Sequence, residues 1–124
     1  MSNLPLVGLK ILEIGHYIAA PFCTRILADL GAEVIKLEPP GGDPFRGWGA
    51  TKGGHSVWFS IHGRNKLSIE LDLKKDRDIL LRLAGRADVL VENLRAGQLE
   101  RLRIGPDALH AVNPRLGIAR ISGY

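Results

Sequence analysis

Side chains that can bind an anion or transfer a proton follow two apolar segments of this sequence. His16 comes after the apolar run at residues 10–14, and Asn93 follows the run at residues 88–92, with several arginines close behind at 95–103. An imidazole can donate a hydrogen bond or act as an acid or base, an amide can both donate and accept, and guanidinium groups bind phosphates well. These residue types indicate an anionic ligand, while no spacing in the sequence nominates a nucleophile.

Each of these residues also has a structural interpretation that the sequence leaves open. His16 could cap the start of a helix, Asn93 could be a turn residue, and the arginines at 95–103 could form a solvated helix face. Cys23 is expected to be an inert core residue, because free cysteine is commonly buried. Position alone therefore does not separate binding from structural roles.

Composition and missing motifs exclude several classes of protein. The chain has 124 residues and a net charge of +4 that is spread along it, so we predict one domain and no nucleic-acid partner. It contains no Walker loop, no G-x-G-x-x-G, no H-E-x-x-H and no G-x-S-x-G. The single cysteine fits no metal-ligand spacing, so we predict no metal. With no signal peptide and no apolar run of membrane-spanning length, we expect a cytoplasmic protein without a membrane partner.

Residues 9–38 are expected to form the strand–helix–strand unit that organises the chain. Residues 10–14 and 34–37 are short apolar runs suited to buried strands. The helix between them is expected to begin near Pro21, since the first helical turn tolerates a missing N–H, and to stop at Gly31. Helical spacing predicts that it faces the core with Phe22, Ile26, Leu27 and Leu30. The two strands should be parallel.

The rest of the chain continues the alternation of strands and helices. Residues 39–56 contain six glycines and are expected to be a long loop, while residues 57–61 could be a helical turn or a strand. Further strands are expected at 66–71, 88–92 and 116–121, and helices at 74–86, 98–102 and 106–112. The fold class is therefore α/β, a Rossmann-like, mostly parallel sheet with flanking helices. Ligands bind beyond the carboxyl ends of such strands, which makes residues 15–19 and 39–43 the first candidate loops.

Several segments, taken together and in order, resemble the family III CoA-transferases, the group that includes formyl-CoA transferase, carnitine CoA-transferase and α-methylacyl-CoA racemase. The segments cover nearly the whole chain: LVGLKILE at 6–13, APFCT at 20–24, LGAEVIKLE at 30–38, GGDPFR at 41–46, NKLSIELDLK at 65–74, ADVLVENLRAG at 87–97, and NPRL to SGY at 113–124. The resemblance implies that residues 1–124 are the CoA-binding N-terminal part of the large domain of an interlocked dimer. It also implies coenzyme A or acyl-CoA as substrate, a carboxylate as the second substrate, and a homodimer at full length.

The resemblance assigns CoA contacts to matched positions. They lie at or after the ends of three of the predicted strands: His16, Tyr17, Ile18, Ala19, Leu71, Lys74, Asn93, Leu94, Arg101 and Leu102. Some positions depart from the family pattern. Pro39 stands where relatives often carry Arg, Leu67 replaces a common Arg, and Leu94 and Ala96 replace the usual Phe and Pro.

The catalytic residues implied by the resemblance lie outside this sequence. Transferase members use an aspartate nucleophile downstream of the S-G-Y-G segment, and racemase members use a histidine just after it, whereas this chain ends at Tyr124. We therefore assign no catalytic residue, and we expect a truncated chain that is inactive alone, marginally stable and rich in exposed apolar surface. The function expected is CoA transfer between an acyl-CoA and a carboxylic acid. The alternatives are a 2-methylacyl-CoA racemase and a non-catalytic CoA-binding remnant.

Overall fold

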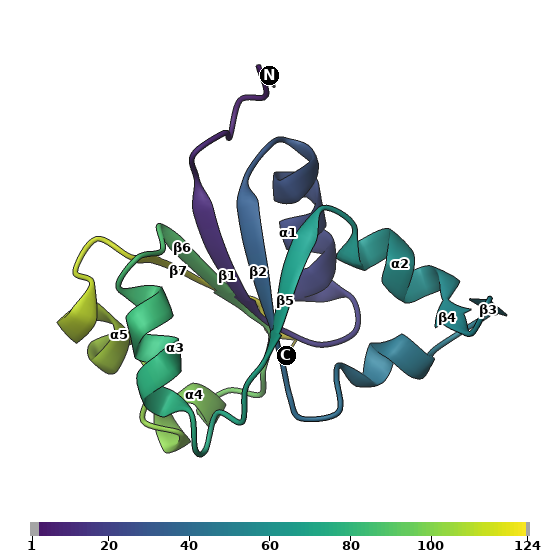
Figure 1. The fold of residues 1–124 in the computed structure, drawn as a ribbon. Coiled ribbons are helices and arrows are strands. Elements are labelled where there is room, and N and C mark those ends of the chain that lie inside the picture. Colours follow the sequence, from purple (N-terminus) through teal and green to yellow (C-terminus); the bar gives the residue numbers. More distant parts are fainter. Residues whose placement is uncertain (1–2, 124) are drawn as a thin grey trace.

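A parallel β-sheet forms the centre of the structure, a computed structural model that describes residues 3–123 (Figure 1). Its strands are β1 (Lys10–Ile14), β2 (Glu33–Glu38), β5 (Lys66–Glu70), β6 (Val89–Glu92) and β7 (Gly117–Arg120). They lie in the order β5-β2-β1-β6-β7, and every neighbouring pair is parallel. The predicted parallel α/β fold is therefore confirmed; Tyr124, the last residue of the matched SGY segment, lies outside the described residues.

The order of the strands reverses next to β1. The chain runs outward from β1 through β2 to β5, then crosses back to β6 on the other side of β1 and continues to β7. Leu12 pairs with Ile35 of β2 and with Leu90 of β6, so β1 is the central strand. The chain leaves β1 toward β2 on one side and leaves β6 toward β7 on the other, so the crevice beyond the carboxyl ends of β1 and β6 is the expected place for a ligand.

Helices cover both faces of the sheet (Figure 1). The helix α1 (Ala19–Asp29) packs on one face with α2 (Val57–Gly63) beside it, and α3 (Arg77–Ala84), α4 (Gln98–Arg101) and α5 (Pro106–Val112) lie on the other. Alternate strand residues point to opposite faces. The larger core therefore collects Leu12, Leu90, Leu80, Leu99 and Leu109, and the smaller one collects Ile11, Val34, Val91, Ala20 and Ala28.

The buried face of α1 differs from the prediction. Phe22, Ile26 and Leu30 are 43%, 42% and 39% exposed, so the predicted core face is wrong for these three residues. The helix instead turns the row Ala20, Thr24 and Ala28 toward the sheet. Small side chains let the helix approach the strands closely, and Thr24 bonds to Glu13 of β1. Of the predicted set only Leu27 packs against the core, with half-buried Cys23 beside it.

Other elements follow the prediction with shifted ends. The helix predicted at 74–86 begins only at Arg77, because the Asp76 carboxylate accepts a hydrogen bond from Asp72 N at 2.8 Å and holds residues 72–76 in a turn. The long loop contains a 3-10 turn, η1 (Pro44–Gly47), and the hairpin β3 (Thr51–Lys52) and β4 (His55–Ser56). Residues 57–61, left open by the sequence, belong to α2. None of the helices within residues 3–123 is long and apolar enough to cross a membrane.

Candidate functional site

An apolar cleft of about 200 Å³ opens at the carboxyl edge of the sheet. It lies beyond β1, β2, β5 and β6, where the strand order reverses. Leucines and prolines dominate its lining, which comprises Ile14, His16, Leu37, Glu38, Pro39, Pro40, Leu71, Asp72, Leu73, Lys74, Leu94, Gln98 and Leu102. The polar and charged residues of the lining are His16, Glu38, Asp72, Lys74 and Gln98. Such a cleft suits a flat or aliphatic part of a ligand.

A cationic basin of about 630 Å³ adjoins the apolar cleft. It is lined by Lys74, Arg77, Gln98, Arg101, Leu102 and Arg103. Three of these residues, Lys74, Gln98 and Leu102, also line the cleft, so the two hollows lie next to each other. All charged side chains of the basin lining are cationic, and guanidinium groups bind phosphates through paired hydrogen bonds. The arrangement fits one ligand that joins an apolar group to phosphates.

The turn after β5 places Lys74 at the junction of cleft and basin. The carboxylate of Asp72 accepts a hydrogen bond from Lys74 N at 3.0 Å. The helix α4, which carries Arg101 and is followed by Leu102, is tied to the sheet by Arg120 of β7. Arg120 donates to Glu92 Oε1 at 2.7 Å and also pairs with Glu100 of α4. These contacts fix both sides of the basin relative to the strands.

Asn93 connects the two strands at the reversal of strand order. Its Oδ1 accepts from His16 N at 2.9 Å, and its Nδ2 donates to His16 O at 2.9 Å. Gly15 makes this approach possible, because a Cβ there would lie 2.6 Å from Asn93 Oδ1 and 2.5 Å from Ala20 Cβ. The loop after β1 is therefore held against β6 by the side chain of Asn93.

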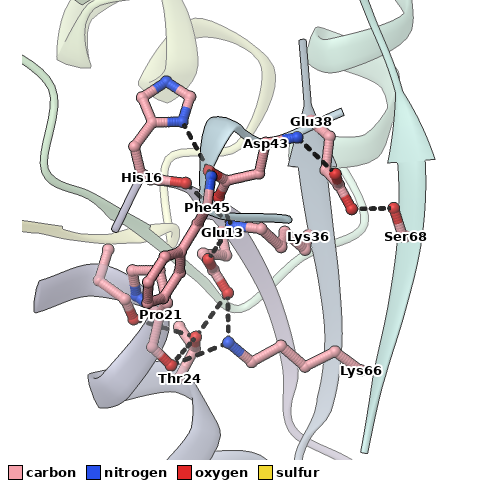
Figure 2. A network of polar contacts seen from close by, with 12 residues as sticks. Glu13, His16, Pro21, Thr24, Lys36, Glu38, Asp43, Phe45, Lys66 and Ser68 are labelled. Carbon is pink, nitrogen blue, oxygen red and sulfur yellow. Dashed lines mark hydrogen bonds and ion pairs between the residues drawn. The ribbon is translucent and has the colours of Figure 1, made fainter. Parts of the chain in front are cut away.

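A buried polar network lies beneath the same loop (Figure 2). Glu13, fully buried in β1, pairs with Lys36 Nζ at 2.7 Å and with Lys66 Nζ at 2.7 Å. Lys36 also donates to Gly15 O at 2.9 Å and pairs with Asp43 at 2.9 Å. One ammonium group thus joins the loop after β1 to the glycine-rich loop after β2.

The charges of this network shift the pKa values of its lysines in opposite directions. Burial lowers the pKa of Lys36, but the carboxylates of Glu13 and Asp43 outweigh it and raise that pKa above its ordinary value. For Lys66, burial outweighs the attraction of Glu13, and the pKa is lowered. The pair of carboxylates beside Lys36 keeps this ammonium charged and the two loops joined.

A second pair fixes the loop after β2. Arg46 donates to both carboxylate oxygens of Glu38, at 2.7 and 2.6 Å, and lies over the ring of Phe59 at 4.2 Å. Ser68 adds a hydrogen bond to Glu38 Oε1 at 2.6 Å. Burial raises the pKa of Glu38, but the hydrogen bonds from Arg46 and Ser68 outweigh it and lower the pKa to about 2. Arg46 therefore has a structural partner and does not line the cleft or the basin.

The structure brings six of the ten predicted contact residues to the cleft and basin. His16, Leu71 and Leu94 line the cleft, Arg101 lines the basin, and Lys74 and Leu102 line both. Tyr17, Ile18 and Ala19 are exposed and line neither hollow, and the Tyr17 ring lies against Phe45 and Trp48. Asn93 lines neither hollow, and its side-chain amide forms two hydrogen bonds with the His16 backbone.

Sequence reasoning missed two groups of residues. Gln98 and Arg77 line the basin, whereas the sequence predicts them only as parts of two helices. Glu13, Lys36 and Asp43 organise the loops, and the available signal was the presence of Glu13 and Lys36 inside otherwise apolar strands. Within residues 3–123 no group of His, Cys, Asp or Glu could hold a metal ion.

Comparison with known proteins identifies the group to which this geometry belongs. The sequence model of CoA-transferase family III matches residues 6–124. The chain belongs to CoA-transferase family III. The resemblance carried by the motifs of the sequence is thereby confirmed, and the matched region is the N-terminal portion of family III proteins.

Two curated members of family III are close in sequence. The chain is 45% identical over 124 residues to the succinyl-CoA–D-citramalate CoA-transferase of Chloroflexus aurantiacus, covering 97% of this chain and 31% of that protein. It is 46% identical over 123 residues to the acetyl-CoA:oxalate CoA-transferase of Acetobacter aceti, covering 97% and 32%. The chain thus spans about a third of the length of these relatives.

The fold is also shared with solved members. The crystal structure of a CAIB/BAIF family protein from Brucella suis matches with a TM-score of 0.92 and 37% identity, over 99% of this chain and 34% of that one. The parallel sheet and its flanking helices are therefore the fold of the corresponding part of a family III protein.

Proposed function

We propose that this chain is the CoA-binding part of an enzyme that moves CoA from an acyl-CoA to a carboxylic acid. The position of the apolar cleft beside the cationic basin, with three shared lining residues, carries this proposal, because CoA joins an apolar adenine ring to phosphates. The printed names of the two curated relatives, both CoA-transferases, support transfer rather than the alternatives of racemisation or a non-catalytic CoA-binding remnant.

In this proposal the cleft binds the adenine of CoA and the basin binds its phosphates. Leu71, Leu102 and Pro39 offer apolar surface to the adenine, while Lys74 and Arg101 meet the phosphates from the adjoining basin. His16 faces the same cleft and would meet a polar group of the pantetheine arm. Tyr17, Ile18, Ala19 and Leu94 remain proposed contacts, as does Asn93, whose main part is to hold the His16 backbone.

We propose that the chemical step is carried by a residue that the family resemblance implies and that none of residues 1–124 supplies. CoA transfer through covalent intermediates on an aspartate side chain, an acyl anhydride and then a CoA thioester, splits one difficult step into easier ones. The family resemblance places that nucleophilic aspartate downstream of residue 124, so none of the aspartates here is given the role. We propose that the full-length enzyme is a homodimer, as the family resemblance implies, and that it is cytoplasmic.

Calorimetric titration of CoA into the 124-residue chain tests the binding role. Lys74→Ala removes the cation at the junction of cleft and basin, and we expect it to weaken CoA binding about tenfold, the value of one charge-assisted contact. Lys75→Ala is the matched control, since Lys75 is exposed and lines neither hollow. Absence of CoA binding by the unmodified chain, or equal losses in both variants, would refute the proposal.

A further inference from the structure

We infer that Arg77 and Arg103 recognise the 3′-phosphate of CoA and so make this chain select CoA over 3′-dephospho-CoA, an inference that rests on the proposed function. Both residues line the cationic basin, and neither lines the apolar cleft. They come from different elements: Arg77 is the first residue of α3, and Arg103 follows the end of α4. The basin therefore receives charge from two sides.

A direct contact brings the two arginines together. Arg77 Nε donates to the backbone oxygen of Arg103 at 2.9 Å, across 26 residues of sequence. This bond uses the inner edge of the guanidinium and orients the plane of the group. Within the described residues, Nη1 has only a 4.0 Å pairing with Asp78, whose side chain is 95% exposed. The bond from Nε thus fixes the orientation of the Arg77 guanidinium, and its Nη groups can donate to a phosphate.

The backbone of Arg103 has an uncommon conformation for a residue with a side chain. Its φ is +59°, in the left-handed region, at the position after a helix end where glycine is usual. The turn is closed by Arg103 N bonding to Glu100 O at 3.0 Å and Ile104 N bonding to Leu99 O at 2.9 Å. This turn presents the carbonyl of Arg103 to Arg77 and places the Arg103 side chain on the lining of the basin.

The number of cations matches the charge of the ligand. A phosphate monoester carries about two negative charges near neutral pH, and the single diphosphate of CoA adds about two more. The basin supplies Lys74, Arg77, Arg101 and Arg103. Lys74 lies at the junction with the apolar cleft, where the adenine is proposed to bind, whereas Arg101, Arg77 and Arg103 line the basin alone. The bond from Arg77 Nε to the Arg103 carbonyl joins these two arginines, so they provide two neighbouring planar donors, the arrangement that best binds a dianionic phosphate.

Binding of CoA and of 3′-dephospho-CoA to the 124-residue chain tests this assignment. We expect the unmodified chain to bind CoA at least about tenfold more tightly than 3′-dephospho-CoA. Arg77→Gln and Arg103→Gly should each weaken CoA binding about tenfold and change binding of 3′-dephospho-CoA by less than about twofold. Glycine adopts the left-handed conformation readily, so Arg103→Gly removes the guanidinium while keeping the turn that presents the residue 103 carbonyl to Arg77. Arg82→Gln is the control, an exposed arginine of α3 outside both hollows.

The outcomes separate this inference from the proposed function. Equal affinities of the unmodified chain for the two ligands would overturn the inference and leave CoA binding intact. Parallel losses for both ligands in Arg77→Gln and Arg103→Gly would also overturn it, because the pair would then bind the diphosphate. A chain that binds neither ligand would overturn the proposed function and this inference together.

Discussion

The side-chain amide of Asn93 makes two hydrogen bonds with the backbone of His16, one as acceptor from His16 N and one as donor to His16 O, both at 2.9 Å. This pairing joins the carboxyl end of β6 to the loop after β1, where the order of the strands reverses. His16 also lines the apolar cleft, so Asn93 sets the position of a cleft residue from 77 positions away in the sequence.

Asn93→Asp should destabilise the chain by about 1–3 kcal/mol, the cost of an unsatisfied polar group in a partly buried site. Aspartate keeps an acceptor for His16 N but loses the donor and places an oxygen against His16 O. Urea unfolding followed by circular dichroism measures the change. Asn3→Asp makes the same amide-to-acid change in the exposed lead-in. Equal stabilities of the two variants would show that the His16 pairing contributes nothing.

The sequence was sufficient to predict the strands and their parallel arrangement. Short apolar runs such as residues 10–14 and 34–37 mark buried strands by local composition, and the intervening helix forces the parallel connection. The structure within the long loop and the start of α3 could not be predicted, because turn residues such as Asp72 and Asp76 act through side-chain bonds that have no periodic signal.

The face of α1 and the polar network could not be predicted. Two rows of residues spaced four apart on α1 could face the sheet. Hydrophobicity favours the row Phe22, Ile26 and Leu30. Close packing of the helix on the strands instead requires the small residues of the row Ala20, Thr24 and Ala28. The partners of Glu13 are Lys36 and Lys66, at separations of 23 and 53 residues. Such pairs depend on strand order and register, which local sequence does not encode.

Glu13→Gln should destabilise the chain by about 3–5 kcal/mol, because it removes one partner of a buried ion pair and leaves the other charged. Glu13 is fully buried, and its carboxylate pairs with both Lys36 and Lys66. Urea unfolding at neutral pH measures the loss. Asp29→Asn, which breaks the solvent-exposed pair with Arg64, is the comparison and should have a much smaller effect. A Glu13→Gln variant as stable as Asp29→Asn would contradict the buried network.

Substitutions on the two faces of α1 should separate them by stability. Ala28→Leu places a larger side chain between helix and sheet and should cost about 1–3 kcal/mol through overpacking. Ile26→Ser, on the outward face, should change the free energy of unfolding by less than about 1 kcal/mol, because Ile26 is 42% exposed. Thermal or urea unfolding of the two variants gives the comparison. A larger loss of stability in Ile26→Ser than in Ala28→Leu would indicate that α1 buries the face predicted from hydrophobicity.

Glu38 should make stability depend on acid pH. Its pKa is lowered from 4.5 to about 2 in the folded chain by the hydrogen bonds from Arg46 and Ser68, against the opposing effect of burial. A group with a lowered folded pKa contributes stability above its unfolded pKa and loses it as pH falls. The contribution of Glu38 is therefore complete above about pH 4.5 and declines toward pH 2, by about 1–2 kcal/mol after screening of half-exposed Arg46 is allowed for. Urea unfolding of the unmodified chain and Glu38→Gln at pH 6 and pH 3 measures this, with the stability difference between them expected to shrink at the lower pH. A difference that stays constant between the two pH values would mean that Glu38 titrates alike in folded and unfolded chains and that its pairing with Arg46 does not stabilise the fold.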